Sequence, residues 1–158
     1  MISSVNAVRY FKLSAEQTGT DDFPRNMMRF LCQCFELIAG KAEQRPVVTA
    51  GFSIANKYWS IGIGDVDSVI EARMKCWDFL ENEGKISQVN ESSKATVRAL
   101  LCVMYPEQID DDFVMELFDW FFEMADVIGD FNHSFDALLP ALKGGSPSKS
   151  TATVPVSL

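Results

Sequence analysis

The chain has few of the side chains on which metal sites and many enzymes depend. It contains one histidine and four cysteines among its 158 residues, and no two cysteines form a CxxC pair. A structural zinc ion requires several Cys or His ligands at close spacing, so no zinc site is expected. We predict that the cysteines are reduced and buried as small apolar residues: Cys32, Cys34, Cys76 and Cys102.

Motifs of the common enzyme classes are also missing. Gly62-Ile63-Gly64 is followed by Asp67 and not by a third glycine, so it is interpreted as a helix break and not as a nucleotide-binding loop. No G-x-S-x-G or P-loop pattern occurs. For His133, a capping or packing role at the start of a helix is favoured over catalysis with Asp130 or Asp136. We therefore expect no catalytic residues, no cofactor and no enzymatic activity.

Long apolar runs and basic clusters are absent as well. No stretch reaches the roughly 18 apolar residues that a membrane span requires. The first residues, MISSVNAVRYFKL, lack the positive and apolar regions of a signal peptide. These features predict a cytoplasmic protein with no membrane partner, and the absence of a basic patch argues against binding of nucleic acid.

Helical periodicity dominates what is present. Apolar residues make up 47% of the chain, which is enough for a hydrophobic core. No alternating pattern bounded by hairpin turns predicts a strand. Apolar residues recur at helical spacing between the prolines and glycines, and the helix that begins at Pro46 is apolar nearly all round, so it is expected to be the most buried. The predicted helices cover 26–42, 46–61, 68–82, 94–104, 112–128 and 134–142.

These helices predict an all-α fold with one domain. Short connections favour a bundle of six to seven mostly antiparallel helices over residues 1–143. Whether Val5, Val8 and Phe11 form one face of a further short helix stays open. Residues 144–158 are rich in Pro, Ser and Thr and are predicted to be a disordered tail.

The negative charge of the chain is concentrated in one segment. The formal net charge is −8, but residues 1–98 contain equal numbers of basic and acidic side chains. Residues 99–142 contain no Lys or Arg and all of the following acids: Glu107, Asp110, Asp111, Asp112, Glu116, Asp119, Glu123, Asp126, Asp130 and Asp136. Asp110–Asp112 are explained as capping and favourable charge at the start of a helix.

Five of these acids, which we call the acidic stripe, keep one helical register. They follow one another at steps of four, three, four and three residues, so they form a continuous row along a helix. Like charges at i,i+4 destabilise a helix by a few tenths of a kcal/mol per pair. The stripe consists of Asp112, Glu116, Asp119, Glu123 and Asp126.

Three interpretations of the acidic stripe stay open. It could be a solvated face whose carboxylates pair with arginines of other helices, such as Arg73 or Arg98. It could also be a docking surface for a basic protein partner, because acidic surfaces speed association with basic proteins and can imitate phosphate spacing. Aromatic residues beside the stripe would then be anchors. The candidate partner-binding residues are Asp112, Glu116, Asp119, Trp120, Phe122, Glu123, Asp126 and Asp130.

The third interpretation is a metal site. Glu116-x-x-Asp119 and Glu123-x-x-Asp126 each place two carboxylates on adjacent helical turns, as magnesium sites in helical bundles require. All-α nucleoside triphosphate pyrophosphohydrolases use acidic pairs of this form. Such an enzyme also needs an acidic partner helix, and the candidates in this sequence have the wrong spacing for that role.

A further pattern lies in the middle of the chain. A helix with a Trp and a glycine break leads into an Ala-Arg helix that ends in Cys and Trp: Ala55-x-x-x-Trp59-x-x-Gly62 and Ala72-Arg73-x-x-Cys76-Trp77. In this pattern the chain resembles small helical immunity proteins of bacterial toxin systems. The resemblance implies an all-α cytosolic protein that neutralises a toxin by tight binding and has no catalytic residues. The matched residues are read as packing residues, and the acidic stripe lies outside them.

Overall fold

The computed structural model describes residues 9–13, 23–42, 45–82, 91–107 and 110–144 of the chain. These residues form helices joined by short links, and none of them lies in a strand. Residues 9–13 are helical as well. The longer helical elements are α2 (Phe23–Ala39), α3 (Pro46–Asn56), η1 (Lys57–Ile61), α4 (Val66–Asn82), α5 (Glu91–Leu101), α6 (Asp111–Ile128) and α7 (Asn132–Gly144).

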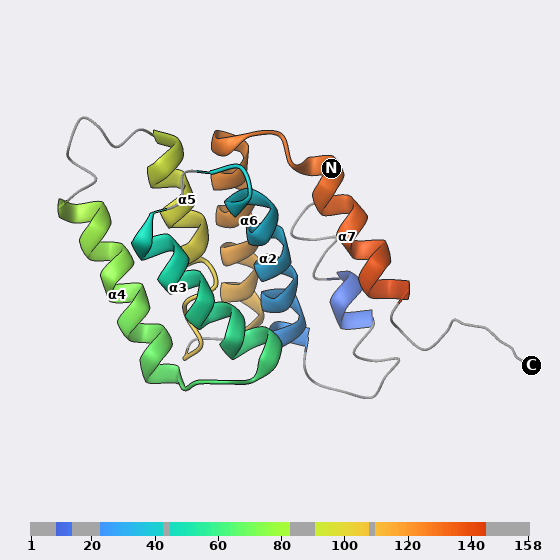
Figure 1. Ribbon diagram of the computed structural model, residues 1–158. Helices are drawn as coiled ribbons and strands as arrows, with labels where there is room; N and C mark the ends of the chain where they lie inside the picture. The colour runs from blue at the N-terminus through green and yellow to red at the C-terminus, as the bar shows by residue number, and fades with distance from the viewer. Residues whose placement is uncertain (1–8, 14–22, 43–44, 83–90, 108–109, 145–158) are drawn as a thin grey trace, which may run out of the picture.

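The helices pack as an up-and-down bundle, as Figure 1 shows. From α2 to α7 each helix runs in the direction opposite to the helix before it. In this view α4 flanks one side of the bundle and α7 the other, with α2, α3, α5 and α6 between them. The predicted all-α bundle of mostly antiparallel helices is therefore confirmed. The predicted tail, apart from Gly144 at the end of α7, and the predicted helix face at Val5 and Val8 lie outside the described residues.

Local signals in the sequence explain where several helices begin. Pro46 starts α3 directly after Arg45, which is extended, and a proline in the first turn needs no backbone donor. The side chain of Asp110 caps α6 by accepting a hydrogen bond from Phe113 N at 3.0 Å. Asp65 accepts a similar bond from Ser68 N at 2.8 Å, and this bond lowers the pKa of the Asp65 carboxyl.

The π-helical turn η1 continues α3 and ends at a left-handed glycine. Gly62 has φ of 80°, a conformation that other residues adopt only with strain. Two arginines of α2 bind the carbonyl groups of this turn: Arg29 Nε donates to Trp59 O at 2.9 Å and Arg25 Nη1 donates to Tyr58 O at 3.1 Å. These bonds satisfy acceptors that the end of a helix leaves without an intrahelical partner.

Helix α5 is buried over most of its length and contacts α2, α3, α4 and α6. Its buried residues include Ala95, Val97, Leu100 and Leu101. By contrast, α3 buries only Val48, Gly51 and Ala55, so the prediction that the Pro46 helix is the most buried was wrong. The apolar side chains of α3 lie on more than one face, and the bundle covers one face only.

Candidate functional site

All five carboxylates of the acidic stripe are exposed on the surface of α6. The opposite face of the helix is buried in the core. Among the described residues, none of the five forms an ion pair or a side-chain hydrogen bond. The repulsion along the stripe is therefore not relieved by a described basic side chain.

The arginines expected to neutralise the stripe do not do so. Arg73 Nη2 lies 2.7 Å from Glu107 Oε2, and Arg73 Nη1 donates to Glu107 Oε1 at 2.9 Å. Glu107 precedes α6 and is not part of the stripe. The guanidinium of Arg98 is exposed and pairs with no carboxylate of the described residues. The predicted pairing of the stripe with Arg73 or Arg98 was thus wrong for the part of the chain that the structure describes.

The acids that flank the stripe have structural roles. Asp110 caps α6, as predicted. The carboxylate of Asp111 lies 2.8 Å from Lys12 Nζ. Asp130 follows the end of α6, and its Oδ1 accepts a hydrogen bond from Asn132 N at 3.3 Å, at the start of α7. Asp130 is exposed, but this bond gives it a role as a turn residue beside any role in binding.

The two candidate aromatic anchors lie in different surroundings. Trp120 keeps 55% of its surface exposed beside the stripe. Phe122 is half-buried, and its ring packs 5.5 Å from that of Phe118 and 5.7 Å from that of Phe135, measured between ring centroids. This packing favours a core role for Phe122 and leaves Trp120 as the anchor candidate.

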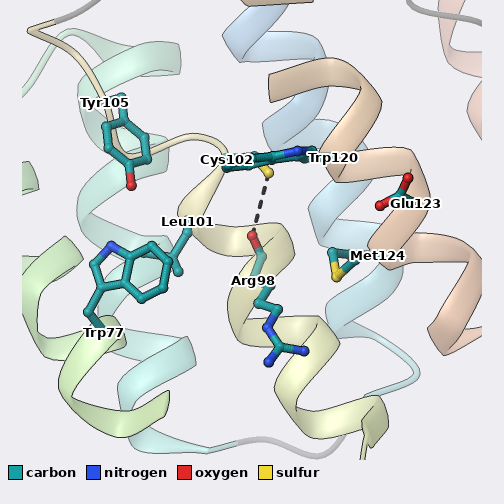
Figure 2. Close-up of a pocket in the computed structure, with 8 residues that line it drawn as sticks. All are labelled: Trp77, Arg98, Leu101, Cys102, Tyr105, Trp120, Glu123 and Met124. Carbon is teal, nitrogen blue, oxygen red and sulfur yellow. Dashed lines mark hydrogen bonds between the residues drawn. The ribbon is translucent and has the colours of Figure 1, made fainter. Parts of the chain in front are cut away.

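A pocket opens next to Trp120, between α4, α5 and α6 (Figure 2). Its volume is about 220 Å³. Aromatic walls are contributed by Trp77 of α4, by Tyr105 after α5 and by Trp120 of α6. The other lining residues are Leu101, Cys102, Met124, Arg98 and Glu123.

The stripe and the pocket lie next to each other, because Glu123 belongs to both. Trp120 and Met124 line the pocket from successive turns of α6, next to the stripe. Arg98 and Glu123 are the two charged residues that line the pocket, and neither side chain pairs with a described residue. The arrangement offers an apolar hollow beside a row of anionic groups.

Trp77 was not predicted to be a site residue, because it was assigned to the buried face of its helix. In the structure it is 41% exposed, whereas Val69, Ala72, Cys76 and Phe79 form the buried face of α4. Trp77 follows Cys76 directly, so it points about 100° away from that face. This offset is visible in the sequence and could have identified Trp77 as a surface residue.

The cysteines are buried and free, as predicted. Burial raises the pKa of the Cys102 thiol to about 12, so the thiol stays neutral where it lines the pocket. Its Sγ donates to Arg98 O at 3.4 Å. Burial also raises the pKa of the other three cysteine thiols. A neutral buried thiol behaves as a small apolar group and not as a nucleophile.

The described residues contain no cluster of ligands that would support the interpretation of the acidic stripe as a metal site. There, no three His, Cys, Asp or Glu side chains lie close enough together to hold a metal ion. Glu116, Asp119, Glu123 and Asp126 form a single row on one helix, and none of them belongs to such a group within the described residues. In the same residues, no helix has both the length and the apolar character that a membrane crossing requires.

Comparisons of the chain with protein-family models, with curated proteins and with solved structures found no match.

Proposed function

We propose that this chain is a cytoplasmic binding protein that holds a basic protein partner against the exposed face of α6. The observation that carries the proposal is the exposure of all five stripe carboxylates without an ion pair among the described residues. A surface that served solubility alone would gain stability from interspersed lysines, because pairs of opposite charge at i,i+4 stabilise a helix.

The charge of the stripe suits a basic partner in two ways. A continuous row of one sign raises the association rate with a molecule of the opposite sign and fixes its orientation. The exposed Trp120 beside the row adds a residue type that contributes strongly to binding at interfaces. Electrostatic steering and an aromatic anchor together suit tight one-to-one binding.

The partner in this proposal is a bacterial toxin with a basic surface, such as a nuclease. The support is the resemblance to immunity proteins, together with the chemistry of the stripe, whose carboxylates can occupy a surface that normally binds phosphates. Of the resembling residues, Ala55, Trp59, Ala72 and Cys76 are buried and contribute to packing. An enzyme of the pyrophosphohydrolase type has no comparable support, because no described acidic cluster could hold its metal ion.

The proposal is tested by reversing two charges in the middle of the stripe, Asp119→Lys together with Glu123→Lys. The partner is isolated from the native host by its affinity for the wild-type chain and is then purified for calorimetry. We expect the double variant to bind about 100-fold more weakly, since two attractive contacts become repulsive.

The matched control is Glu71→Lys together with Asp78→Lys on α4. Both side chains are exposed and form no ion pair with described residues, and the double change alters the net charge by the same amount. The control should bind like the wild type. Equal affinity of the stripe variant and the wild type would refute the proposal, as would a weakening of the same size in the control.

A further inference from the structure

Two of the three tryptophans, Trp77 and Trp120, lie at the surface on different helices and line the same pocket. Trp77 is 41% and Trp120 is 55% exposed, whereas Trp59 is buried. Large exposed aromatic side chains that converge on a hollow are typical of the centre of an interface, where a side chain of the partner is enclosed. The pocket is therefore expected to bind a group of another molecule.

The size of the pocket limits the occupant. Sites for drug-sized ligands and cofactors occupy about 300–1,000 Å³, whereas this pocket measures about 220 Å³. It is also much larger than the roughly 10–15 Å³ of cavity that one water molecule requires. The volume suits one large side chain better than a nucleotide or a similar cofactor.

The lining determines the chemistry of that side chain. Leu101 and Cys102 form apolar surface between the two tryptophans, and Met124 adds apolar surface beside Trp120. The two charged lining residues, Arg98 and Glu123, have opposite signs, so the pocket itself carries no net charge. Outside the pocket, the rest of the acidic stripe is purely anionic. The hollow thus favours a neutral apolar side chain, while its surroundings favour cations.

We infer that the pocket between Trp77 and Trp120 receives one large apolar side chain, aromatic or aliphatic, from a basic segment of the protein partner. Lysines or arginines on either side of that anchor pair with Glu116, Asp119 and the other stripe carboxylates. Arg98 and Glu123 at the pocket supply a hydrogen-bond donor and acceptor for the main chain of the segment. This inference rests on the proposed function and adds to it the recognition motif: one apolar anchor between basic residues.

The inference is tested with three synthetic helical peptides of equal length. The first has lysines at i, i+3, i+4 and i+7 and one central phenylalanine. The second replaces the phenylalanine with alanine, and the third replaces the lysines with glutamates. Affinities are measured by calorimetry for the wild type, Trp77→Ala, Trp120→Ala and the double variant Asp119→Lys/Glu123→Lys.

We expect the wild type to bind the phenylalanine peptide about ten-fold more tightly than the alanine peptide. Each tryptophan variant should lose this preference and keep the affinity for the alanine peptide. Met74→Ala is the matched control, because Met74 is a large exposed apolar residue of α4 that does not line the pocket, and it should keep the preference. Circular dichroism checks that every variant is folded.

A second measurement tests binding to the pocket with a ligand that cannot pair with the stripe. The wild type is labelled with 5-fluorotryptophan, and its fluorine NMR signals are followed during titration with N-acetyl-phenylalanine amide, which carries no charge. We expect the signals of Trp77 and Trp120 to shift and that of the buried Trp59 to stay in place.

The outcomes separate the inference from the proposed function. Unchanged signals of Trp77 and Trp120, or a preference for phenylalanine that survives in both tryptophan variants, would overturn the anchor pocket while leaving the acidic docking face intact. Conversely, equal affinity for the lysine and glutamate peptides, with no effect of the charge reversal, would overturn the proposed function. Shifts at Trp77 and Trp120 would then still support the pocket.

Discussion

Arg73 shows how single residues hold the segment between α5 and α6 in place. Its guanidinium binds both carboxylate oxygens of Glu107, donates to Met104 O at 3.1 Å and lies 4.3 Å from the centre of the Tyr105 ring. Tyr105 in turn lines the pocket. One arginine of α4 therefore positions part of the pocket wall through charge-assisted bonds and a cation–π contact.

The pair of Arg73 and Glu107 predicts a pH-dependent stability. The hydrogen bond from Arg73 holds the pKa of the Glu107 carboxyl below its ordinary value of 4.5. A lowered pKa in the folded state stabilises the protein above the ordinary pKa, and this contribution is lost as the pH falls through the lowered value. Since the pair is partly exposed, Glu107→Gln should cost about 1 kcal/mol at pH 7.

Urea unfolding of the wild type and of Glu107→Gln at a series of pH values checks this expectation. The gap in the free energy of unfolding should be present at pH 7 and should close as the pH falls from the ordinary carboxyl pKa through the lowered value. A gap that stays constant down to pH 3 would show that the ion pair is not its cause.

At the scale of elements, α6 combines a buried apolar face with an exposed face that is purely anionic. This anionic face lowers the stability of the helix, because its like charges lie at i,i+3 and i,i+4. The residues of a binding surface are selected for function and not for stability. Substitutions at such a surface can therefore stabilise the protein while they impair binding. The docking interpretation therefore predicts that α6 can be stabilised by a change that impairs binding.

Glu116→Lys should raise the free energy of unfolding by about 0.5–1 kcal/mol at low ionic strength, because it places a lysine between Asp112 and Asp119 at favourable helical spacing. The gain should shrink in salt, which screens exposed charges. Thermal unfolding at low and high salt provides the measurement, and Glu116→Gln, which removes a charge without adding one, should give a smaller gain. A destabilised Glu116→Lys variant would argue against unrelieved repulsion in the stripe.

The junction of η1 with α5 is a second element-scale feature. Trp59 Nε1 donates to Val103 O at 2.8 Å in the buried core, and this bond joins the π-helical turn to the turn that follows α5. Trp59→Phe leaves that buried carbonyl without its donor and should cost about 1–3 kcal/mol. Urea unfolding measures the loss.

Trp77→Phe serves as the control, since Trp77 is 41% exposed and its indole makes no hydrogen bond to a described residue. It should change the stability by no more than about 0.5 kcal/mol. Equal losses for the two variants would show that the bond to Val103 contributes nothing beyond the size of the side chain.

At the scale of the whole molecule, the fold was predictable and the complete site was not. Periodicity and helix-ending glycines predict helices close to those observed: 68–82 is expected and α4 spans Val66–Asn82, and 94–104 is expected where α5 spans Glu91–Leu101. Such patterns are local, so they can be recognised directly in the sequence. The helix ends differ because caps and tertiary packing decide the terminal turns.

The acidic stripe was predictable for the same reason, because all its members lie on one helix. The pocket was not, since its walls come from α4, α5 and α6 and meet only in the folded bundle. Whether the stripe paired with Arg73 or Arg98 also depended on tertiary structure. For Arg73 it was decided by the position of Glu107, which binds the guanidinium.

The charge distribution of the chain gives the most direct test of the acidic docking face. A stripe that steers a basic partner makes the association rate depend strongly on ionic strength, while buried apolar contacts respond little to salt. Stopped-flow association of the purified partner with the wild type and with Asp119→Lys/Glu123→Lys, from low to high salt, measures this dependence. We expect the wild-type rate to fall by at least about ten-fold between about 0.01 and 0.3 M salt and the variant rate to be low and nearly flat. Parallel salt profiles for the two proteins would contradict a docking role for the acidic stripe.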